Sequence, residues 1–207
     1  MPGAVCVRGG VSRGVVLDPG AVSASAVAAA CDGAGAVRVE DPFSVIDLAP
    51  FGFGPEFEMD VMARPAGAGA APAACTDVAV ERVADAEALA VAERVVVEGF
   101  PIPRRGRGTL LPPAILTLPG STAWLARRDG RPAGALTAYD DGASLGMYLL
   151  ATLPDHRRRG VGAALLAAAA AAAPSRPAVL TATGDGAPLY AACGYASAGR
   201  ATWWWRG

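Results

Sequence analysis

The hydrophobic and polar positions of the N-terminal third fall into short runs with two different spacings. Runs at 36–40 and 44–48 have the residue types of short strands, and apolar residues alternate with acidic ones at 57–61, as in a half-buried strand. The alanine-rich stretch 21–31 is typical of a helix instead. The pattern therefore predicts a small α/β segment, in which we find no residues that suggest chemistry.

Residues 65–74 interrupt this pattern. They read Pro-Ala-Gly-Ala-Gly-Ala-Ala-Pro-Ala-Ala, carry no charge and are low in complexity, which is typical of a linker or a long loop. We therefore expect an N-terminal segment, 1–75, followed by a separate domain, 76–207.

Strand and helix patterns follow one another through 76–207, and proline and glycine mark their ends. Asp85 is a suitable N-cap, Asp129-Gly130 is typical of a hairpin turn, and Pro154 ends the longest apolar run. The predicted elements are a strand at 78–83, a helix at 85–98, strands at 122–127, 133–138 and 145–153, a helix at 160–173, a strand at 178–183, a short helix from Pro188 and a strand at 202–206. This order predicts an α/β (α+β) fold, a mixed sheet flanked by helices.

Composition narrows the class of protein. The chain is 53% hydrophobic and 18% charged, which excludes a disordered chain. Its net charge of −1 lacks the basic footprint of a nucleic-acid-binding protein, so we expect no nucleic-acid partner. It has 48 alanines, and all 18 basic residues are arginine; lysine, asparagine and glutamine are absent. A motif that ordinarily uses asparagine or lysine must therefore use another residue here.

The cysteines and the single histidine do not suggest a metal site. Cys6, Cys31, Cys75 and Cys193 lie far apart, and His156 is the only histidine, so we expect no metal and cysteines that serve as small packing residues in a reducing compartment. No apolar run reaches the roughly 20 residues of a membrane span. The sequence thus favours a cytoplasmic protein without a membrane partner.

The joint between the strand at 145–153 and the helix at 160–173 carries the strongest signal. A loop with three successive arginines leads into a helix that begins Gly-Val-Gly-Ala. The first N–H groups of a helix lack internal partners and suit a phosphate, and arginine adds charge-assisted hydrogen bonds. Taken alone, this pattern favours a different interpretation, in which the arginines are a solvated charged surface and the glycines merely begin a helix.

Two glycine motifs are excluded at this joint. A dinucleotide fingerprint requires a third glycine where Leu165 stands, and a P-loop requires a lysine. The pattern R-x-x-G-x-G/A does fit, and 152–163 resembles the acetyl-CoA-binding motif of the GNAT superfamily of N-acetyltransferases. The stretch 186–195, with Leu-Tyr followed by Gly-Tyr, resembles the second motif of that family. The resemblance extends from about residue 76 to the end.

The resemblance implies a role for each matching residue. The backbone of the strand end would pair with the pantetheine arm and help hold the oxyanion. The amides of the loop and helix start would bind the pyrophosphate, beside the arginine of the motif. Tyr190 would protonate the departing thiolate, and Thr183 stands where the family often has asparagine. The implied cofactor-binding residues are Leu150, Ala151, Thr152, Arg157, Arg158, Arg159, Gly160, Val161, Gly162, Ala163 and Thr183.

The activity implied is direct transfer of an acetyl group from acetyl-CoA to a primary amine of a small molecule or a protein. The sequence does not identify the acceptor itself. The strand at 145–153 carries no carboxylate, which leaves Glu98 as a candidate base beside water or an acceptor that arrives as a free amine. The same gap favours an alternative, a catalytically silent GNAT-like domain that binds CoA as a sensor or structural ligand.

Two further features remain open. Trp203-Trp204-Trp205 would put its first and third side chains on one face of a strand and the second on the other, for packing, for a homodimer interface or as a wall of the acceptor pocket. In addition, 51–61 resembles the closing strands of a second, degenerate GNAT copy.

Overall fold

The computed structural model describes residues 3–8, 11–68, 77–100 and 108–207 and divides the chain into two compact units. Unit 1 holds Met1–Met62, Thr181–Asp185 and Ser197–Gly207; unit 2 holds Ala63–Leu180 and Gly186–Ala196. Residue 75, where the sequence predicts the boundary, lies outside the described residues, and that boundary stays a prediction. The described start of the expected linker belongs to unit 2, where the N–H of Gly67 donates to the carbonyl of Pro174 at 3.2 Å.

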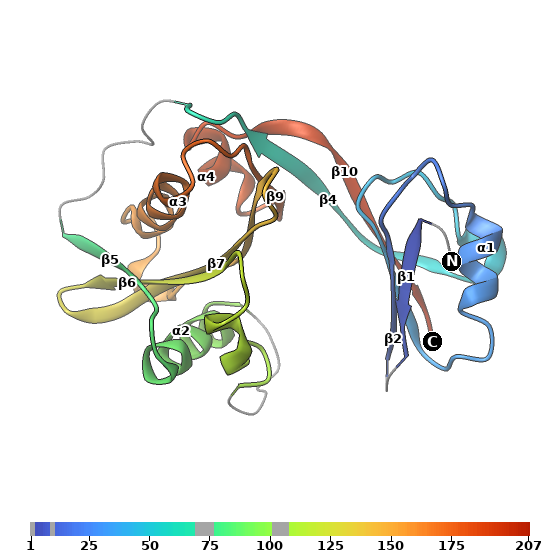
Figure 1. Cartoon of the computed structure of the whole chain (residues 1–207), viewed down its shortest axis with the longest axis horizontal. Coiled ribbons are helices and arrows are strands. Elements are labelled where there is room, and N and C mark those ends of the chain that lie inside the picture. Colours follow the sequence, from blue (N-terminus) through green and yellow to red (C-terminus); the bar gives the residue numbers. More distant parts are fainter. Residues whose placement is uncertain (1–2, 9–10, 69–76, 101–107) are drawn as a thin grey trace. The chain divides into compact units, whose positions relative to one another are not determined.

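Unit 2 is a mixed sheet with a helix layer on each face. Its strand order is β9-β8-β7-β6-β5; β8 and β9 are parallel and the other pairs antiparallel. Helix α2 lies against one face, and α3 and α4 lie on the other (Figure 1). The elements are β5 (Val78–Arg82), α2 (Ala86–Gly99), β6 (Ser121–Arg128), β7 (Arg131–Asp140), β8 (Leu145–Thr152), α3 (Val161–Ala172), β9 (Ala178–Ala182) and α4 (Ala187–Ala192). The predicted α/β sheet flanked by helices is confirmed.

The local signals in the sequence explain these elements. The Asp85 carboxylate accepts from the N–H groups of Glu87 and Ala88 and so begins α2 where the N-cap was predicted. The turn residues Asp129 and Gly130 both have positive φ, as a two-residue hairpin between β6 and β7 requires. Gly134 of β7 leaves room for α3, whose Val161 and Leu165 side chains occupy the space that a Cβ would take.

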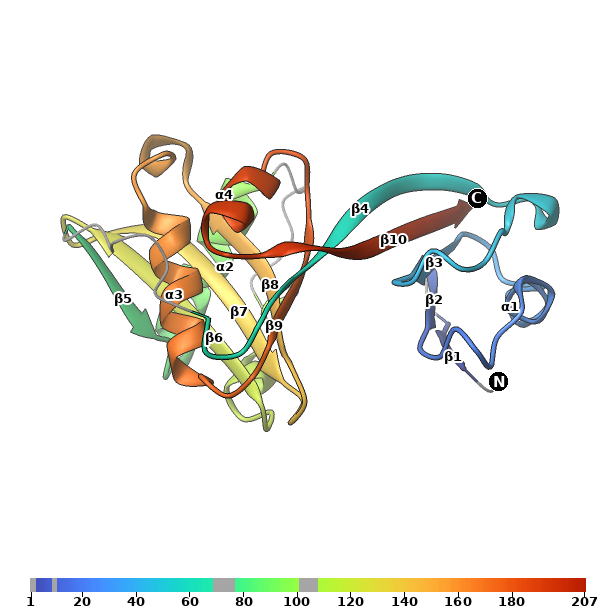
Figure 2. The same cartoon turned by 90° about the horizontal axis from the view of Figure 1, so that it is seen from above.

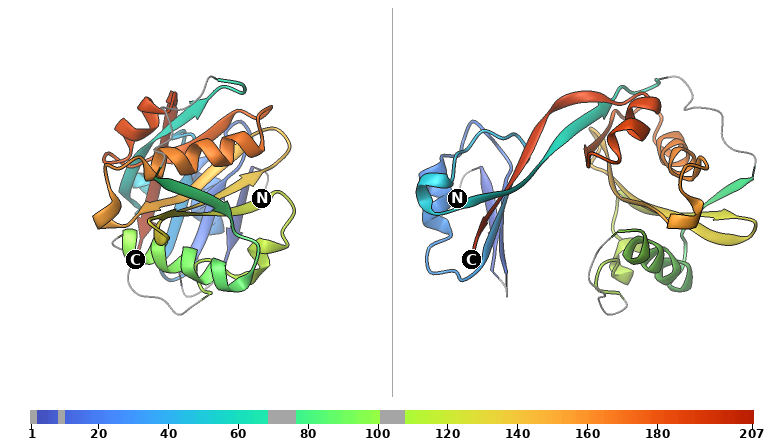
Figure 3. Two further views of the ribbon diagram at one scale, coloured as in Figure 1. Left: turned by 90° about the vertical axis from the view of Figure 1, so that its left-hand side faces the viewer. Right: turned by 180° about the vertical axis from the view of Figure 1, so that it is seen from behind.

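Unit 1 is a sheet covered on one face by a single helix (Figure 3). Its strand order is β1-β2-β3-β10-β4, with β2 and β3 parallel and joined through α1. The long strands β4 and β10 are neighbours and run together (Figure 2). The elements are β1 (Ala4–Val7), β2 (Ser12–Val16), α1 (Ala24–Ala30), β3 (Val37–Asp41), β4 (Gly54–Arg64) and β10 (Ala196–Arg206).

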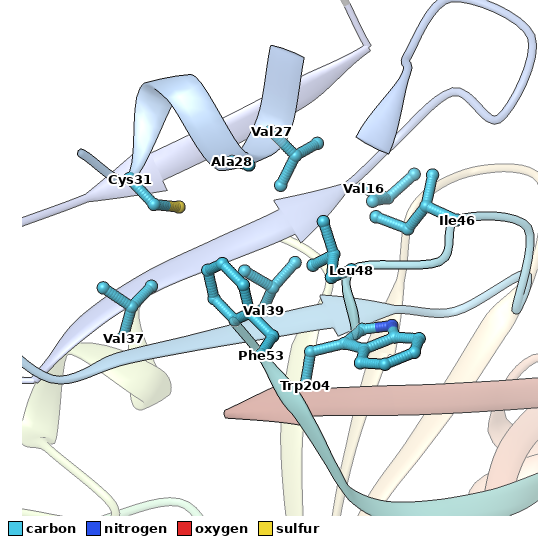
Figure 4. Packing of buried hydrophobic residues seen from close by; sticks show 10 residues of the cluster. All are labelled: Val16, Val27, Ala28, Cys31, Val37, Val39, Ile46, Leu48, Phe53 and Trp204. Carbon is cyan, nitrogen blue, oxygen red and sulfur yellow. The ribbon is translucent and has the colours of Figure 1, made fainter. Parts of the chain in front are cut away.

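The tryptophan run alternates across β10 as predicted. Trp204 lies in the unit 1 core together with Phe53 and the α1 side chains (Figure 4). On the other face, the Trp203 ring stacks on Phe57 with 5.0 Å between centroids, and the Arg38 guanidinium lies 5.8 Å from the centre of the Trp205 ring. These contacts account for packing; a dimer at this surface stays a prediction.

Two predictions in unit 1 were wrong, and two of its strands were not predicted. The strand expected at 44–48 is an irregular loop, because the buried Asp41 carboxylate accepts from the N–H groups of Phe43, Val45 and Ile46 and replaces a ladder of strand hydrogen bonds. Strands β1 and β2 were not predicted. Cys6 is exposed on the edge strand β1 rather than packed, whereas Cys31 and Cys193 are buried and Cys75 lies outside the described residues.

None of the described helices is long and apolar enough to cross a bilayer.

Candidate functional site

The centre of the candidate site is an irregularity in β8. Tyr148 pairs with Thr137 of β7 and Ala151 pairs with Ala135, so two residues of β8 stand opposite one residue of β7. This is a β-bulge, and its first residue, Leu149, has φ of 53°, which is uncommon for a residue other than glycine. Bulges leave backbone groups outside the ladder and gather beside functional sites. The Thr137 hydroxyl donates to the carbonyl of Tyr148 at 3.1 Å and so fixes the backbone just before the bulge.

The opposite edge of β8 is open over the same stretch. Its parallel pairing with β9 consists of Leu145 with Ala178 and Gly146 with Val179. From Met147 to Thr152, β8 continues without a β9 partner among the described residues. The backbone of Leu150, Ala151 and Thr152, predicted to pair with a pantetheine arm, therefore lies in a segment that an extended ligand could join as a strand does.

Beyond β8, the chain turns into α3 through a loop with two left-handed residues. Arg158 has φ of 59°, and Gly160, the residue before the helix, has φ of 76°. The first hydrogen bond of the helix is donated by Ala164 to the carbonyl of Gly160, so the N–H groups of 161–163 have no partner within the helix. These three N–H groups make a site for an anion at the positive end of the helix dipole.

The three arginines of the loop do different things. Arg157 donates from Nε to the carbonyl of Thr152 at 3.3 Å and from Nη2 to the carbonyl of Gly99 at 2.9 Å. It therefore connects the end of α2 to the end of β8, a role that the sequence did not predict. Arg158 and Arg159 are exposed at the start of α3, where phosphate oxygens could reach them. A cofactor contact remains a prediction for all three.

Helix α4 brings the proposed acid close to this helix start. A Cβ on Gly162 would lie 2.7 Å from Cδ2 of Leu189, so glycine lets α4 pack on α3 there. The next residue, Tyr190, is 9% exposed, and its ring meets the edge of the Tyr195 ring with 6.1 Å between centroids. Burial raises the pKa of Tyr190 above its usual range, which keeps the phenol protonated at neutral pH.

The remaining candidates are less closely defined. Thr183 is exposed in the loop after β9. Glu98 is exposed near the end of α2, next to Gly99, where a Cβ would lie 3.0 Å from the Cβ of Ala151. The chain neighbour of Glu98 therefore packs against the end of β8, but no contact assigns Glu98 itself a role. His156 has a buried Nδ1 without a hydrogen-bond partner in the part of the chain that is described. The described residues contain no group of three or more potential metal ligands.

Part of this chain is similar to a known protein family. Residues 119–197 match the family model described as "Acetyltransferase (GNAT) domain". This range includes the bulge, the helix start and Tyr190. No curated protein matches the chain.

Solved structures share the fold over nearly the whole chain. A GCN5-related N-acetyltransferase from Kribbella flavida is 23% identical, with a TM-score of 0.69 over 94% of this chain and 80% of that one. One from Sphaerobacter thermophilus is 15% identical, with a TM-score of 0.67 over 98% and 75%. A tandem GNAT protein from the clavulanic acid biosynthesis pathway is 14% identical, with a TM-score of 0.62 over 99% and 83%.

Proposed function

We propose that this chain, a member of the GNAT superfamily, is an acetyl-CoA-dependent N-acetyltransferase. One observation carries the proposal: a bulged strand with one open edge leads through a single loop into a helix start, where three N–H groups have no partner within the helix. An extended thioester arm that ends in a pyrophosphate needs these two features side by side. The coarser assignment, a GNAT acetyltransferase domain, rests on the family match.

The residues present suit the cosubstrate. The N–H groups of 161–163 would hold the pyrophosphate, with the exposed Arg158 and Arg159 beside them. The backbone of Leu150–Thr152 would pair with the pantetheine arm, and N–H groups of the bulge would stabilise the oxyanion. When bound, acetyl-CoA supplies an acetyl group already activated as a thioester.

The bonds and protons of the acetyl transfer balance with Tyr190 as the only acid. The amine nitrogen of the acceptor bonds to the acetyl carbon, and the bond between that carbon and sulfur breaks. The nitrogen loses one proton to solvent, and the thiolate gains one from the Tyr190 hydroxyl, which is later reprotonated from solvent. A buried phenol with a raised pKa suits this step, because it is protonated when the thiolate forms.

A second candidate function is supported by what β8 lacks. Its sequence, Leu-Gly-Met-Tyr-Leu-Leu-Ala-Thr, holds no carboxylate or histidine that could accept the amine proton. A GNAT-like domain that binds CoA without turnover would need no such base. We place this candidate second because Tyr190 is present and buried.

The two candidates separate in one experiment. The full chain is incubated with acetyl-CoA and a panel of primary amines, thiol release is followed, and thermal unfolding is measured with CoA. An acetyltransferase shows stabilisation by CoA together with thiol release that depends on an amine. Stabilisation without release for any amine would support the silent domain, and the absence of both would contradict both.

We propose in addition that unit 1 is a degenerate GNAT-like half. Its βαβ crossover from β2 through α1 to β3 and the fold shared with a tandem GNAT protein over 99% of this chain support the idea. A cytoplasmic location and a homodimer rest on the sequence and stay predictions.

A further inference from the structure

Two large aromatic side chains of unit 2 lie exposed in the middle of its sheet. Tyr148 of β8 is 55% exposed and Tyr139 of β7 is 40% exposed. Their neighbours along the strands, Met147 and Ala138, are buried. Helices lie on both faces of this sheet, so aromatic rings exposed on two of its inner strands mark a part that no described helix covers.

The strand register shows which face they share. Ala135 and Ala151 are directly paired and pack in the hydrophobic cluster of α2. The next pair on the same face is Thr137 with Tyr148, and the pair after that is Tyr139 with Gly146. The two tyrosines therefore lie on the α2 face of the sheet, just beyond the part that α2 covers.

The tyrosines are held in place by a glycine. A Cβ on Gly146 would lie 2.4 Å from the Tyr148 hydroxyl oxygen and 2.6 Å from its Cε2, so the Tyr148 ring lies across the Gly146 backbone. Gly146 is the direct strand partner of Tyr139, and the Tyr139 hydroxyl is near enough to influence that of Tyr148 electrostatically. The lack of a side chain at Gly146 thus makes room for the Tyr148 ring.

The surface is close to the bulge and carries negative charge. Tyr148 directly precedes Leu149, the first residue of the bulge. Partial burial of the Tyr148 hydroxyl and the nearby Asp141 carboxylate raise the pKa of Tyr148. Hydrogen bonds from the N–H groups of Ser144 and Ala143 lower the pKa of Asp141, so this carboxylate is ionised at neutral pH. An exposed aromatic surface beside a carboxylate attracts a cationic ligand with an aromatic ring.

We propose that Tyr139 and Tyr148 bind the ring of the acceptor, and that the acceptor is a small primary amine joined to an aromatic ring by a short linker. This inference rests on the proposed acetyl transfer and specifies its substrate class. A linker of about two carbons lets the ring stack on Tyr148 while the amine reaches the bulge at Leu149. Asp141 draws in the ammonium form, which loses its proton to solvent before it reacts.

The test compares two amines on the full-length wild-type chain. The probes are 2-phenylethylamine and n-butylamine, and thiol release gives kcat/KM for each. We expect 2-phenylethylamine to be preferred at least tenfold. Tyr148→Ala should reduce that preference by about 2- to 10-fold, the value of one aromatic contact, while the KM for acetyl-CoA changes little.

Two variants keep the result specific to the ring. Gly146→Ala should also reduce the preference, because the new Cβ displaces the Tyr148 ring, and a flexible ring end can move without unfolding the sheet. Tyr148→Phe keeps the ring and should keep the preference. Thermal unfolding of each variant checks the fold.

The possible failures are distinguishable. Acetylation of n-butylamine at the same efficiency as 2-phenylethylamine, or a preference unaltered by Tyr148→Ala, would overturn the inference and leave the acetyltransferase standing. If no amine is acetylated, both fail. A wild-type dimer that Tyr148→Ala converts to a monomer in sedimentation, with the amine preference unchanged, would make this surface an interface between copies and would likewise overturn the inference.

Discussion

Replacing Gly160 by valine tests whether the start of α3 binds the phosphates of CoA. Gly160 has φ of 76°, where an L-residue costs about 1–2 kcal/mol, and the added side chain would stand where the pyrophosphate approaches. For a chain of this size, each kcal/mol lowers Tm by about 2–4 °C, so the variant should unfold about 2–8 °C below the wild type. CoA at 100 times its Kd stabilises the wild type by about 2.7 kcal/mol, a rise of about 5–11 °C. Gly160→Val should abolish that rise.

Gly130 supplies the matched control. It has φ of 73° in the β6–β7 turn, and a Cβ there would meet nothing within 4 Å. Gly130→Val should therefore carry a similar backbone penalty far from the proposed site and keep the full rise with CoA. Thermal unfolding of the three proteins, with and without CoA, is the assay. An equal rise in both variants would place the phosphates elsewhere and refute the assignment.

Three other substitutions address the acid, a buried carboxylate and the packing of α3. Tyr190→Phe keeps the ring and should lower kcat by about 10²–10⁴-fold with little change in the KM for acetyl-CoA; steady-state rates within threefold of the wild type would contradict its role as acid. Burial by itself would raise the pKa of Glu93, but the N–H groups of Gly108, Leu110 and Leu111 more than offset it and lower that pKa. A carboxyl group whose pKa is lower in the folded than in the unfolded state stabilises the fold at pH values above its unfolded pKa, and this stabilisation is lost as the pH falls through its folded pKa. Glu93→Gln should therefore lower Tm more at pH 7 than at pH 3. A decrease in Tm that does not depend on pH would count against the argument. Gly134→Ala would place a Cβ 2.6 Å from a methyl group of Val161 and 3.0 Å from the Ala151 carbonyl oxygen, and urea unfolding should show a loss of about 1–3 kcal/mol that Gly35→Ala, with open space around it, does not show.

The elements of unit 2 could be predicted because their signals are local. Asp85 caps α2 through its own carboxylate, and Asp129-Gly130 makes its turn through the φ values that this dipeptide favours. The apolar pattern and the glycine and proline residues at its ends likewise predicted the helix at 160–173, which is α3 in the structure. The loop at 44–48 was mistaken for a strand because it carries strand-type apolar residues, of which Ile46 and Leu48 are buried. Its hydrogen bonds come from Asp41, which no periodicity reveals.

The candidate site was predicted in part for the same reason. The glycines and the tyrosine belong to motifs that are contiguous in sequence. The bulge at Leu149 is a mismatch of register between two strands, and a run of apolar residues does not show where a register slips. The hydrogen bond from Arg157 to Gly99 joins residues 58 positions apart in the sequence, so it could be found only from the fold. The orientation of Tyr148 followed only from the pairing of β7 with β8.

The stretch of β8 without a β9 partner, Met147–Thr152, affects how readily the protein aggregates. Unpaired strand backbone is a template on which another chain can add a strand, the first step of aggregation. Bulges twist a strand and break the regular spacing that an added strand needs. The bulge at Leu149 therefore also makes β8 a poor template for a foreign strand. Straightening it would expose the protein to self-association.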